Sequence, residues 1–305
     1  MKDEIKEITE RMKTFREMLL LPKPKDLDFE NWLDNFQEQD EKELAARILN
    51  HFIYFSDDLI DQMLRTAVGR CGYYFMQNVP GWNHNSFKSE CWYSFIQGEN
   101  PEDATDSGYI FTRKLREVLN IPDKRIIKFD ALFKKLEENT STPQNVILVD
   151  DFVGSDVCSS DLWNKHKLGL KDMTLSELQS RFNHRIIYAP LVVNDMGLST
   201  IKDYCSNLHL EYIYHLGPES NLFNINGIFW AGNRGSYAKF LNMMYRIAKE
   251  QNIPVTEGDS VNDMKGFGKQ GLALAFHHGI PDACPAFFYW NTENWKPLKN
   301  RPYHR

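Results

Sequence analysis

The sequence predicts an α/β fold, in which a mostly parallel sheet of five strands is flanked by helices and preceded by an N-terminal α-helical appendage. The length of 305 residues suits one large domain, or a catalytic domain with a helical addition. Up to about residue 68 the apolar residues recur at helical spacing, whereas after Gly69 short apolar runs alternate with amphipathic stretches, as parallel α/β units do. We therefore expect a helical region over residues 1–68 and an α/β domain over residues 69–305.

Four helices are expected in the first region. Apolar residues at three- and four-residue steps predict a helix over 5–19, which Pro22 ends because proline cannot continue a helix. A second, short helix over 29–36 carries aromatic residues on one face, a third begins near Asp40, and a fourth follows the candidate cap Ser56.

In the second region, strands and helices are expected to alternate. The expected strands are, in order, 91–96, 125–129, 145–149, 185–193 and 211–216. Helices over 109–119 and 195–206 form crossovers, and a further helix covers 236–250. The segments 266–276 and 286–290 are either strands or buried loops.

The composition argues against several classes of protein. Lys and Arg number 36 against 42 Asp and Glu, and the net charge of -6 offers no general attraction to nucleic acid or anionic lipid. The five cysteines are odd in number and lack a C-x-x-C pair, which argues against a disulfide framework and a structural zinc site. Because there is neither a signal peptide nor a long apolar stretch, we expect a cytoplasmic protein that does not span a membrane.

The most informative motif is the apolar run 146–149, which leads into the carboxylates Asp150 and Asp151 and then the small residues Gly154 and Ser155. Ligands of open α/β sheets bind beyond the carboxyl ends of strands, so the acidic pair should lie at the lip of a site. Two adjacent carboxylates suit ribose hydroxyls, directly or through magnesium, and the backbone N–H groups of a small-residue loop suit a phosphate. The motif therefore indicates a sugar phosphate, although receiver domains and other doubly wound folds carry a similar run.

A second candidate anion site is the loop that ends at Ser107 and Gly108, just before an expected helix. The positive end of a helix favours anions, and Arg113, Lys114 and Arg116 lie close by in the sequence. A capped helix start with solvated basic residues is an equally simple interpretation.

Four segments of the chain together carry a family resemblance. They are Asp106-Ser107-Gly108-Tyr109, Val149-Asp150-Asp151-Phe152-Val153-Gly154-Ser155, Tyr188-Ala189-Pro190-Leu191-Val192, and Gly266-Phe267-Gly268 through Ala275-Phe276-His277-His278. Their order resembles the type I phosphoribosyltransferase fold and, more closely, the phosphoribosyltransferase-like family of prokaryotic conflict systems called PRTase-CE. The resemblance covers most of the chain, helical appendage included. It implies a phosphoribosyltransferase-like sheet, phosphoribosyl pyrophosphate (PRPP) or a related nucleotide as ligand, magnesium as cofactor, and a role in bacterial antiphage defence.

The resemblance also implies a role for three pairs of residues. By this resemblance, Asp150 and Asp151 bind the ribose hydroxyls and magnesium. The 5′-phosphate is bound by Gly154 and Ser155, and the leaving pyrophosphate by Ser107 and Gly108. No nucleophilic side chain is required, because the protein supplies position and electrostatics to a loose transition state. Purine-salvage relatives carry a carboxylate three positions after the second acid, where this chain has glycine, so that role is disfavoured.

The loop after Gly154 departs from the family pattern. Asp156 stands where the family has a further glycine, and Cys158 where it has a hydroxyl or small residue. A carboxylate that faces a phosphate is unfavourable, which argues against an active enzyme. The octapeptide 155–162 also resembles a translated sequencing adapter, and resequencing of the source gene tests whether it is native.

His277 and His278 are the remaining candidates for a catalytic side chain. Adjacent residues of a strand point to opposite faces, so the two imidazoles cannot easily bind one metal ion. One of them could line the acceptor pocket as a base or donor, whereas a hydrogen-bonded structural pair is the simpler interpretation.

Large aromatic residues are expected to pack internally rather than bind ligands or partners. Tryptophan can stack on a nucleobase, but a position in the core is the more frequent use. This expectation concerns Trp230, Trp290, Trp295 and the aromatic face Phe29, Trp32 and Phe36.

Two functions are left open. One is a magnesium-dependent, phosphoribosyltransferase-like effector enzyme, which the intact acidic pair favours. The other is a catalytically inactive module that senses a nucleotide or docks onto a protein encoded in the same defence locus, which the altered loop favours. We expect no direct nucleic-acid partner, because basic and acidic residues are mixed.

Overall fold

The computed structural model describes residues 2–83, 87–96, 108–154, 161, 163–165, 167–255 and 263–301. The chain forms two compact units: Met1–Leu59 with Gly217–Arg305, and Ile60–Leu216. The expected boundary at residues 68 and 69 falls within one continuous helix, α4 (Asp57–Asn78). The two units therefore differ from the expected regions 1–68 and 69–305. The first part of the chain packs with the last part instead of forming a region of its own.

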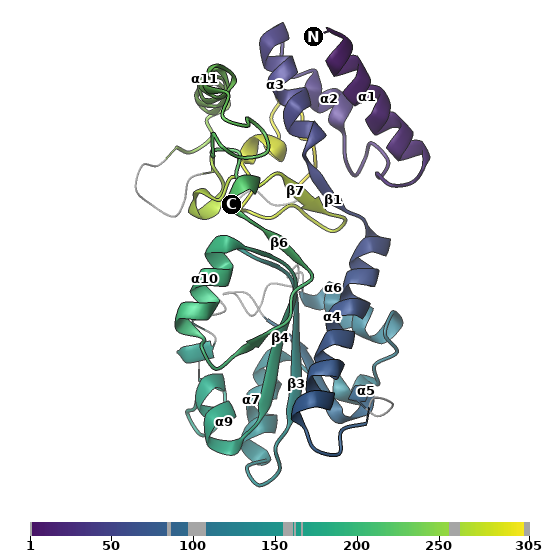
Figure 1. Cartoon of the computed structure of the whole chain (residues 1–305), viewed down its shortest axis with the longest axis vertical. Helices are drawn as coiled ribbons and strands as arrows, with labels where there is room; N and C mark the ends of the chain where they lie inside the picture. The colour runs from purple at the N-terminus through teal and green to yellow at the C-terminus, as the bar shows by residue number, and fades with distance from the viewer. Residues whose placement is uncertain are drawn as a thin grey trace. The chain divides into compact units, whose positions relative to one another are not determined.

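The unit Ile60–Leu216 is built on a parallel sheet of five strands, of which Figure 1 labels β3, β4 and β6. The strands are β2 (Cys91–Phe95), β3 (Asn145–Val153), β4 (Arg185–Asn194), β5 (His209–Leu210) and β6 (Tyr214–Leu216). The order is β2-β3-β4, and the short strands β5 and β6 both pair with β4 at different points along it. All the pairings are parallel, which confirms the predicted fold class.

Helices cover both faces of this sheet. The helices of the unit, besides α4, are α5 (Phe87–Glu90), α6 (Gly108–Glu117), α7 (Phe129–Glu138), α9 (Leu175–Phe182) and α10 (Asp195–Tyr204). Buried apolar residues of α7, α9 and α10 form one core cluster with Leu148 and Tyr188 of the sheet. Helix α6 contacts β2 and β3 and lies on the other side, together with α4 (Figure 1).

Two of the expected strands differ in the structure. The segment 125–129 is not a strand: a short 3₁₀ turn, η1 (Asp123–Arg125), follows Pro122, and Ile126 forms only an isolated bridge to Tyr93. Phe129 opens α7 instead, because it shares helical spacing with the buried Leu132, Phe133 and Leu136 of that helix. Of the expected strand 211–216, only the residues of β6 form a strand, and β5 precedes this range.

The other unit combines helices with a two-stranded parallel sheet, β1 (Ile53–Phe55) and β7 (Leu274–Phe276). Its α-helices are α1 (Lys2–Glu17), α2 (Phe29–Leu33), α3 (Gln39–Asn50) and α11 (Arg234–Glu250). Its 3₁₀ turns are η2 (Pro218–Ser220), η3 (Phe267–Lys269) and η4 (Ala286–Phe288). The segment 286–290 is thus a turn, and only the end of 266–276 is a strand.

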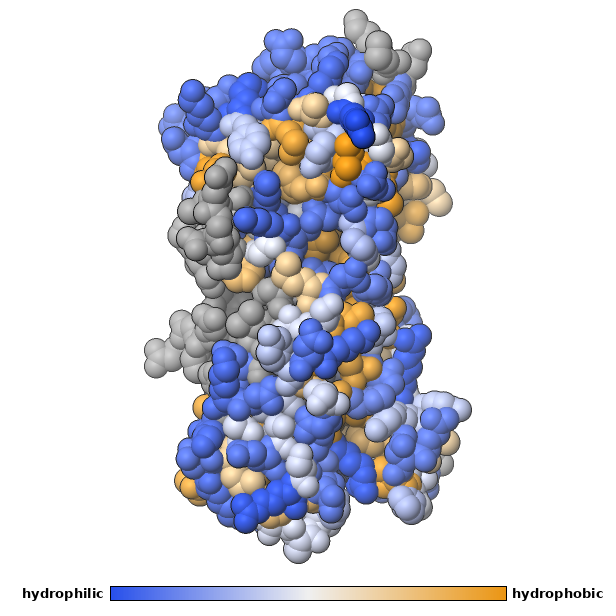
Figure 2. Space-filling view, turned by 60° about the vertical axis from the view of Figure 1, so that its left-hand side comes forward, coloured by the Kyte–Doolittle hydropathy of each residue, from blue (hydrophilic) through white to orange (hydrophobic). Residues whose placement is uncertain are grey.

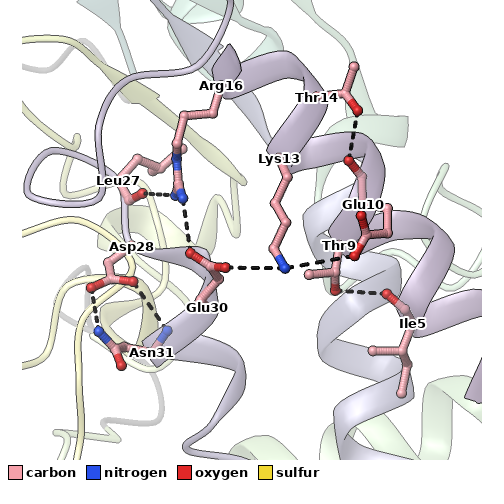
Figure 3. Close-up of polar contacts among 10 residues, drawn as sticks. All are labelled: Ile5, Thr9, Glu10, Lys13, Thr14, Arg16, Leu27, Asp28, Glu30 and Asn31. Atoms are coloured by element: carbon pink, nitrogen blue, oxygen red, sulfur yellow. Dashed lines mark hydrogen bonds and ion pairs between the residues drawn. The ribbon is translucent and has the colours of Figure 1, made fainter.

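Arg16 fixes the chain between α1 and α2 (Figure 3). Its guanidinium forms an ion pair of 2.9 Å with Glu30 and donates hydrogen bonds to backbone carbonyls that include that of Leu27. The same group lies 4.3 Å from the centroid of the Phe29 ring, so it packs against an aromatic face as well. Asp28 caps α2 by accepting the N–H of Asn31.

The aromatic face of α2 lies in the core of this unit, as predicted. Trp32 is fully buried and its ring centroid lies 5.6 Å from that of Phe288. The indole N–H groups of Trp32 and Trp295 both donate to the carbonyl of Phe287, at 2.9 and 3.0 Å. This cluster joins the N-terminal helices to the end of the chain.

Trp230 and Trp290, which were also expected to pack internally, bond to the backbone as well. Trp230 is buried and donates to Leu222 O, and the partly buried Trp290 donates to Gln251 O. The core positions of Trp230 and Trp295 favour the packing interpretation over base stacking.

Hydrophilic residues cover most of the coloured surface in Figure 2, with apolar residues scattered among them. Within the described residues, no helix is both long enough and apolar enough to cross a membrane.

Candidate functional site

The acidic pair lies within the central strand, near its carboxyl end. Strand β3 continues to Val153, and Asp150 is in register with Pro190 of β4. Both Asp150 and Asp151 are partly buried, whereas the preceding Val149 is fully buried. The strand therefore runs four residues further than the sequence pattern indicated, and the pair occupies its sixth and seventh positions of nine.

Tyr188 of β4 holds the first carboxylate. Its hydroxyl donates a hydrogen bond of 2.7 Å to Asp150 Oδ2, and both side chains lie on the face covered by α7, α9 and α10. Burial raises the pKa of Asp150 well above its usual value, and the neighbouring carboxylate of Asp151 raises it further. The hydrogen bond from Tyr188 lowers this pKa and opposes the first two effects.

Asp151 is the immediate neighbour of Asp150, and its side chain interacts with that of Asp150. Its backbone N–H donates to Asp150 Oδ1 at 2.9 Å, which fixes the first carboxylate relative to the strand. The pair therefore offers two neighbouring carboxyl groups near the carboxyl end of β3.

The loops expected to bind phosphates are described only in part. Ser155 and Ser107 lie outside the described residues. Gly154 directly follows β3, and its carbonyl oxygen would lie 2.5 Å from a Cβ atom added to Gly197 of α10. The end of β3 and the first turn of α10 thus approach as closely as a glycine allows.

Gly108 is the first residue of α6 and is buried. A Cβ atom at this position would lie 1.9 Å from the ring of Phe95, the last residue of β2. Phe95 is in register with Val149, so the N-terminus of α6 lies close to the acidic pair along the sheet. Packing alone requires a glycine at this position.

The basic residues of α6 are paired with acids. Lys114 is buried and forms an ion pair of 2.5 Å with Asp61, while Arg113 and Arg116 both contact Glu117. These contacts favour a structural role for the basic residues over direct binding of an anion.

His277 and His278 follow β7 in the other compact unit, so they do not belong to the sheet that carries the acidic pair. His277 is exposed; its Nδ1 lies 3.2 Å from the hydroxyl of Tyr54, and its carbonyl accepts a hydrogen bond from Lys299. Burial raises the pKa of Tyr54 to about 12, so this hydroxyl stays protonated at neutral pH. A catalytic role for the histidine pair stays a prediction.

Three further polar residues of the sheet unit had no predicted role: Tyr188, Asp195 and His215. The imidazole Nε2 of His215 lies 2.6 Å from Asp195 Oδ1. Tyr188 stands in the resemblance motif, but only the register of β3 and β4 shows that it reaches Asp150. Asp195 and His215 are 20 residues apart, and no local pattern joins them.

A cavity of about 510 Å³ lies at the opposite, amino end of the sheet. His184, Arg185, Tyr74 and His209 line it. His184 has a structural role, because its two ring nitrogens form hydrogen bonds with the backbone of Gln144 and Leu136. This end of a parallel sheet is not where ligands usually bind.

The comparisons with known proteins agree with the motifs. No curated protein and no solved structure matches the chain. The model of the PRTase-CE family, however, matches residues 29–301. Because this match spans nearly the whole sequence and includes the acidic strand, the chain belongs to the PRTase-CE family.

Proposed function

We propose that this protein binds PRPP, or a related nucleotide or sugar phosphate, with magnesium, and that it acts as an effector of a bacterial defence system. The observation that carries the proposal is the position of Asp150 and Asp151 near the carboxyl end of the central parallel strand, beside the N-terminus of α6. Ligands of open α/β sheets bind at this end, and helix N-termini there favour phosphates.

The acidic pair fits magnesium that is shared with a ligand. Within the described ranges, no group of three or more His, Cys, Asp and Glu side chains could hold a metal ion. Magnesium commonly binds through one or two carboxylates together with substrate phosphates, and Asp150 and Asp151 could supply the carboxylates. The bound cation would neutralise charge on the departing pyrophosphate.

The residues themselves would hold the sugar. Carboxylate oxygens of the acidic pair would accept hydrogen bonds from the ribose hydroxyls, and the N-terminus of α6 would face the pyrophosphate. Reaction at the ribosyl carbon needs no nucleophilic side chain, since orientation and electrostatic complementarity lower the barrier.

One observation favours the second candidate function, a module that senses a nucleotide without turnover. The pKa of Asp150 is raised well above its usual value, so this carboxyl retains its proton into a higher pH range than an ordinary aspartate. A neutral acid can hydrogen-bond a sugar, but it is a poor magnesium ligand until the cation displaces its proton.

Isothermal titration calorimetry with PRPP and magnesium chloride tests the proposal. Wild-type protein is expected to bind PRPP, and Asp150→Asn with Asp151→Asn should weaken binding by about 10- to 100-fold for each charge-assisted hydrogen bond lost. Asp203→Asn, an exposed acid of α10, is the control and should bind like the wild type. Equal affinity of the double variant and the wild type would place the ligand elsewhere.

Pyrophosphate release from PRPP then separates the two candidate functions. Release that the double variant loses supports the enzyme, whereas binding without release supports the sensing module.

A further inference from the structure

The side chains of His215 and Asp195 form a hydrogen-bonded pair near the acidic strand. His215 Nε2 lies 2.6 Å from Asp195 Oδ1, and both side chains are partly exposed. His215 belongs to β6 and Asp195 opens α10, which follows directly on β4. Figure 1 shows β6 and α10 next to the end of β4. The pair is therefore a titratable group near the carboxyl end of the sheet, where we propose that the ligand binds.

Both members of the pair are held by ordered structure. Asn194 is buried and caps α10, with its side-chain oxygen accepting the N–H of Gly197 at 2.8 Å. Gly197 in turn packs against the carbonyl of Gly154. His215 is in register with Val193, so β4 fixes its backbone. A catalytic group needs this kind of support, because small misplacements cost much of the rate.

The pair lies nearer to the carboxyl end of the sheet than Asp150 does. His215 is in register with Val193 and Val153, which pack in the core cluster that also contains Tyr188, the partner of Asp150. Two strand spacings and three residues along the strand separate the Cα atoms of Asp150 and His215, about 14 Å in total. A sugar phosphate and its acceptor, bound along the carboxyl end of the sheet, can span this separation.

The hydrogen bond decides which imidazole nitrogen can accept a proton. An ionised carboxylate only accepts hydrogen bonds, so Nε2 of His215 carries the proton that Asp195 holds. In the part of the chain that the structure describes, His215 Nδ1 makes no hydrogen bond. The lone pair of Nδ1 is therefore available to a ligand, and Asp195 stabilises the positive charge that protonation would create.

We infer that His215 is the general base of the proposed reaction and that Asp195 positions it; this inference rests on the proposed function. The acceptor is a molecule that attacks through an O–H or N–H group. As its oxygen or nitrogen bonds to the ribosyl carbon, the carbon–oxygen bond to pyrophosphate breaks and the electron pair leaves with pyrophosphate. The proton of the acceptor passes to His215 Nδ1. The pair thus supplies the base that the glycine at position 154 does not.

The chain contains a matched control for this pair. His209 Nε2 lies 2.9 Å from Glu211 Oε1, so an imidazole and a carboxylate are joined in a similar way. His209 belongs to β5, which pairs with Ile187 and Tyr188 toward the amino end of β4. His209→Gln therefore removes the same chemical group away from the proposed site.

The experiment measures hydrolysis of PRPP, with water as the acceptor, by pyrophosphate release over a range of pH, alongside PRPP affinity by calorimetry. His215→Gln should lower kcat by about 100-fold or more, and it should remove the acidic limb of the pH profile. Its PRPP affinity should stay within about threefold of the wild-type value. Asp195→Asn should shift the acidic limb, Asp195→Glu should restore part of the rate, and His209→Gln should behave as the wild type.

The outcomes separate the inference from the proposed function. If the wild type binds PRPP but releases no pyrophosphate, or if His215→Gln keeps the wild-type rate and pH profile, the inference is wrong while the binding proposal stands. If the wild type does not bind PRPP at all, the proposed function fails and this inference fails with it.

Discussion

The surroundings of Asp150 change the properties of its carboxyl group. Tyr188 bonds to it from the adjacent strand, and burial raises its pKa well above the usual value. The sequence could indicate that two acids end an apolar run, because residue identity and order suffice for that. It could not indicate the partner, because the contact depends on the register of β3 against β4.

This raised pKa predicts how stability depends on pH. An unfolded aspartate releases its proton near pH 3.9, whereas folded Asp150 retains it to higher pH, so the folded state binds more protons between these values. The stabilisation that Asp150 contributes to the folded state is therefore greatest below about pH 3.9 and decreases as pH rises toward its folded pKa. Asp150→Asn removes this decrease in stability with pH, since asparagine has no proton to release.

Urea unfolding at pH 5 and pH 8, followed by circular dichroism, measures the effect. The urea midpoint of Asp150→Asn minus that of the wild type should be larger at pH 8 than at pH 5. Asp203→Asn, which changes an exposed acid, serves as the control. A difference between variant and wild type that is unchanged between the two pH values would show that Asp150 has an ordinary pKa.

At the scale of elements, the close approach of α10 to the end of β3 sets the shape of the site. A Cβ atom on Gly197 would lie 2.5 Å from both Gly154 O and Val153 Cγ1. Gly197→Ala is therefore expected to destabilise the protein by about 1–3 kcal/mol through overpacking. It should also weaken PRPP binding, because it displaces the chain that follows the acidic pair.

Gly69→Ala is the matched control. Gly69 lies within α4, and nothing lies within 4 Å of a Cβ atom added there. Alanine has the better helix propensity, so this variant should be more stable than wild type by about 0.5–1 kcal/mol. Thermal unfolding measures both variants; equal effects at the two positions would contradict the packing argument.

Most elements of the sheet unit could be predicted from the sequence. The predictions were wrong for segments in which a strand pattern and a helix or turn pattern compete. The runs at 91–96 and 185–193 are strands because continuous apolar residues suit a sheet buried on both faces. The segment 125–129 has strand-like composition, but helical spacing from Phe129 onward and Pro122 before it define a turn and a helix instead. Within 211–216 only β6 is a strand, and its position depends on pairing with β4, which no local pattern encodes.

For the whole molecule, the main difference from the sequence-based expectation is how distant segments combine. The aromatic residues of α2 were expected to pack internally, and they do, against Phe287, Phe288 and Trp295. This joins residues more than 250 positions apart. Periodicity shows that a helix has an apolar face, but it does not show which segment covers that face.

Fragments of the chain test this organisation. The fragment 60–216 holds a complete parallel sheet with helices on both faces and is expected to fold by itself, with a cooperative thermal transition. The fragment 69–305 lacks Trp32 and Phe36, so the aromatic core of the other unit is incomplete. In limited proteolysis its residues from 217 onward should be cleaved faster than in the full chain. Equal protection would show that this segment folds without the N-terminal helices.

The full-length chain also allows the most direct test of the proposed ligand site, a crystal structure with PRPP and magnesium bound. The ribose hydroxyls are expected within hydrogen-bonding distance, about 2.5–3.0 Å, of the carboxylates of Asp150 and Asp151. A sugar phosphate bound elsewhere, for example in the cavity lined by Arg185 and His209 at the amino end of the sheet, would contradict the account.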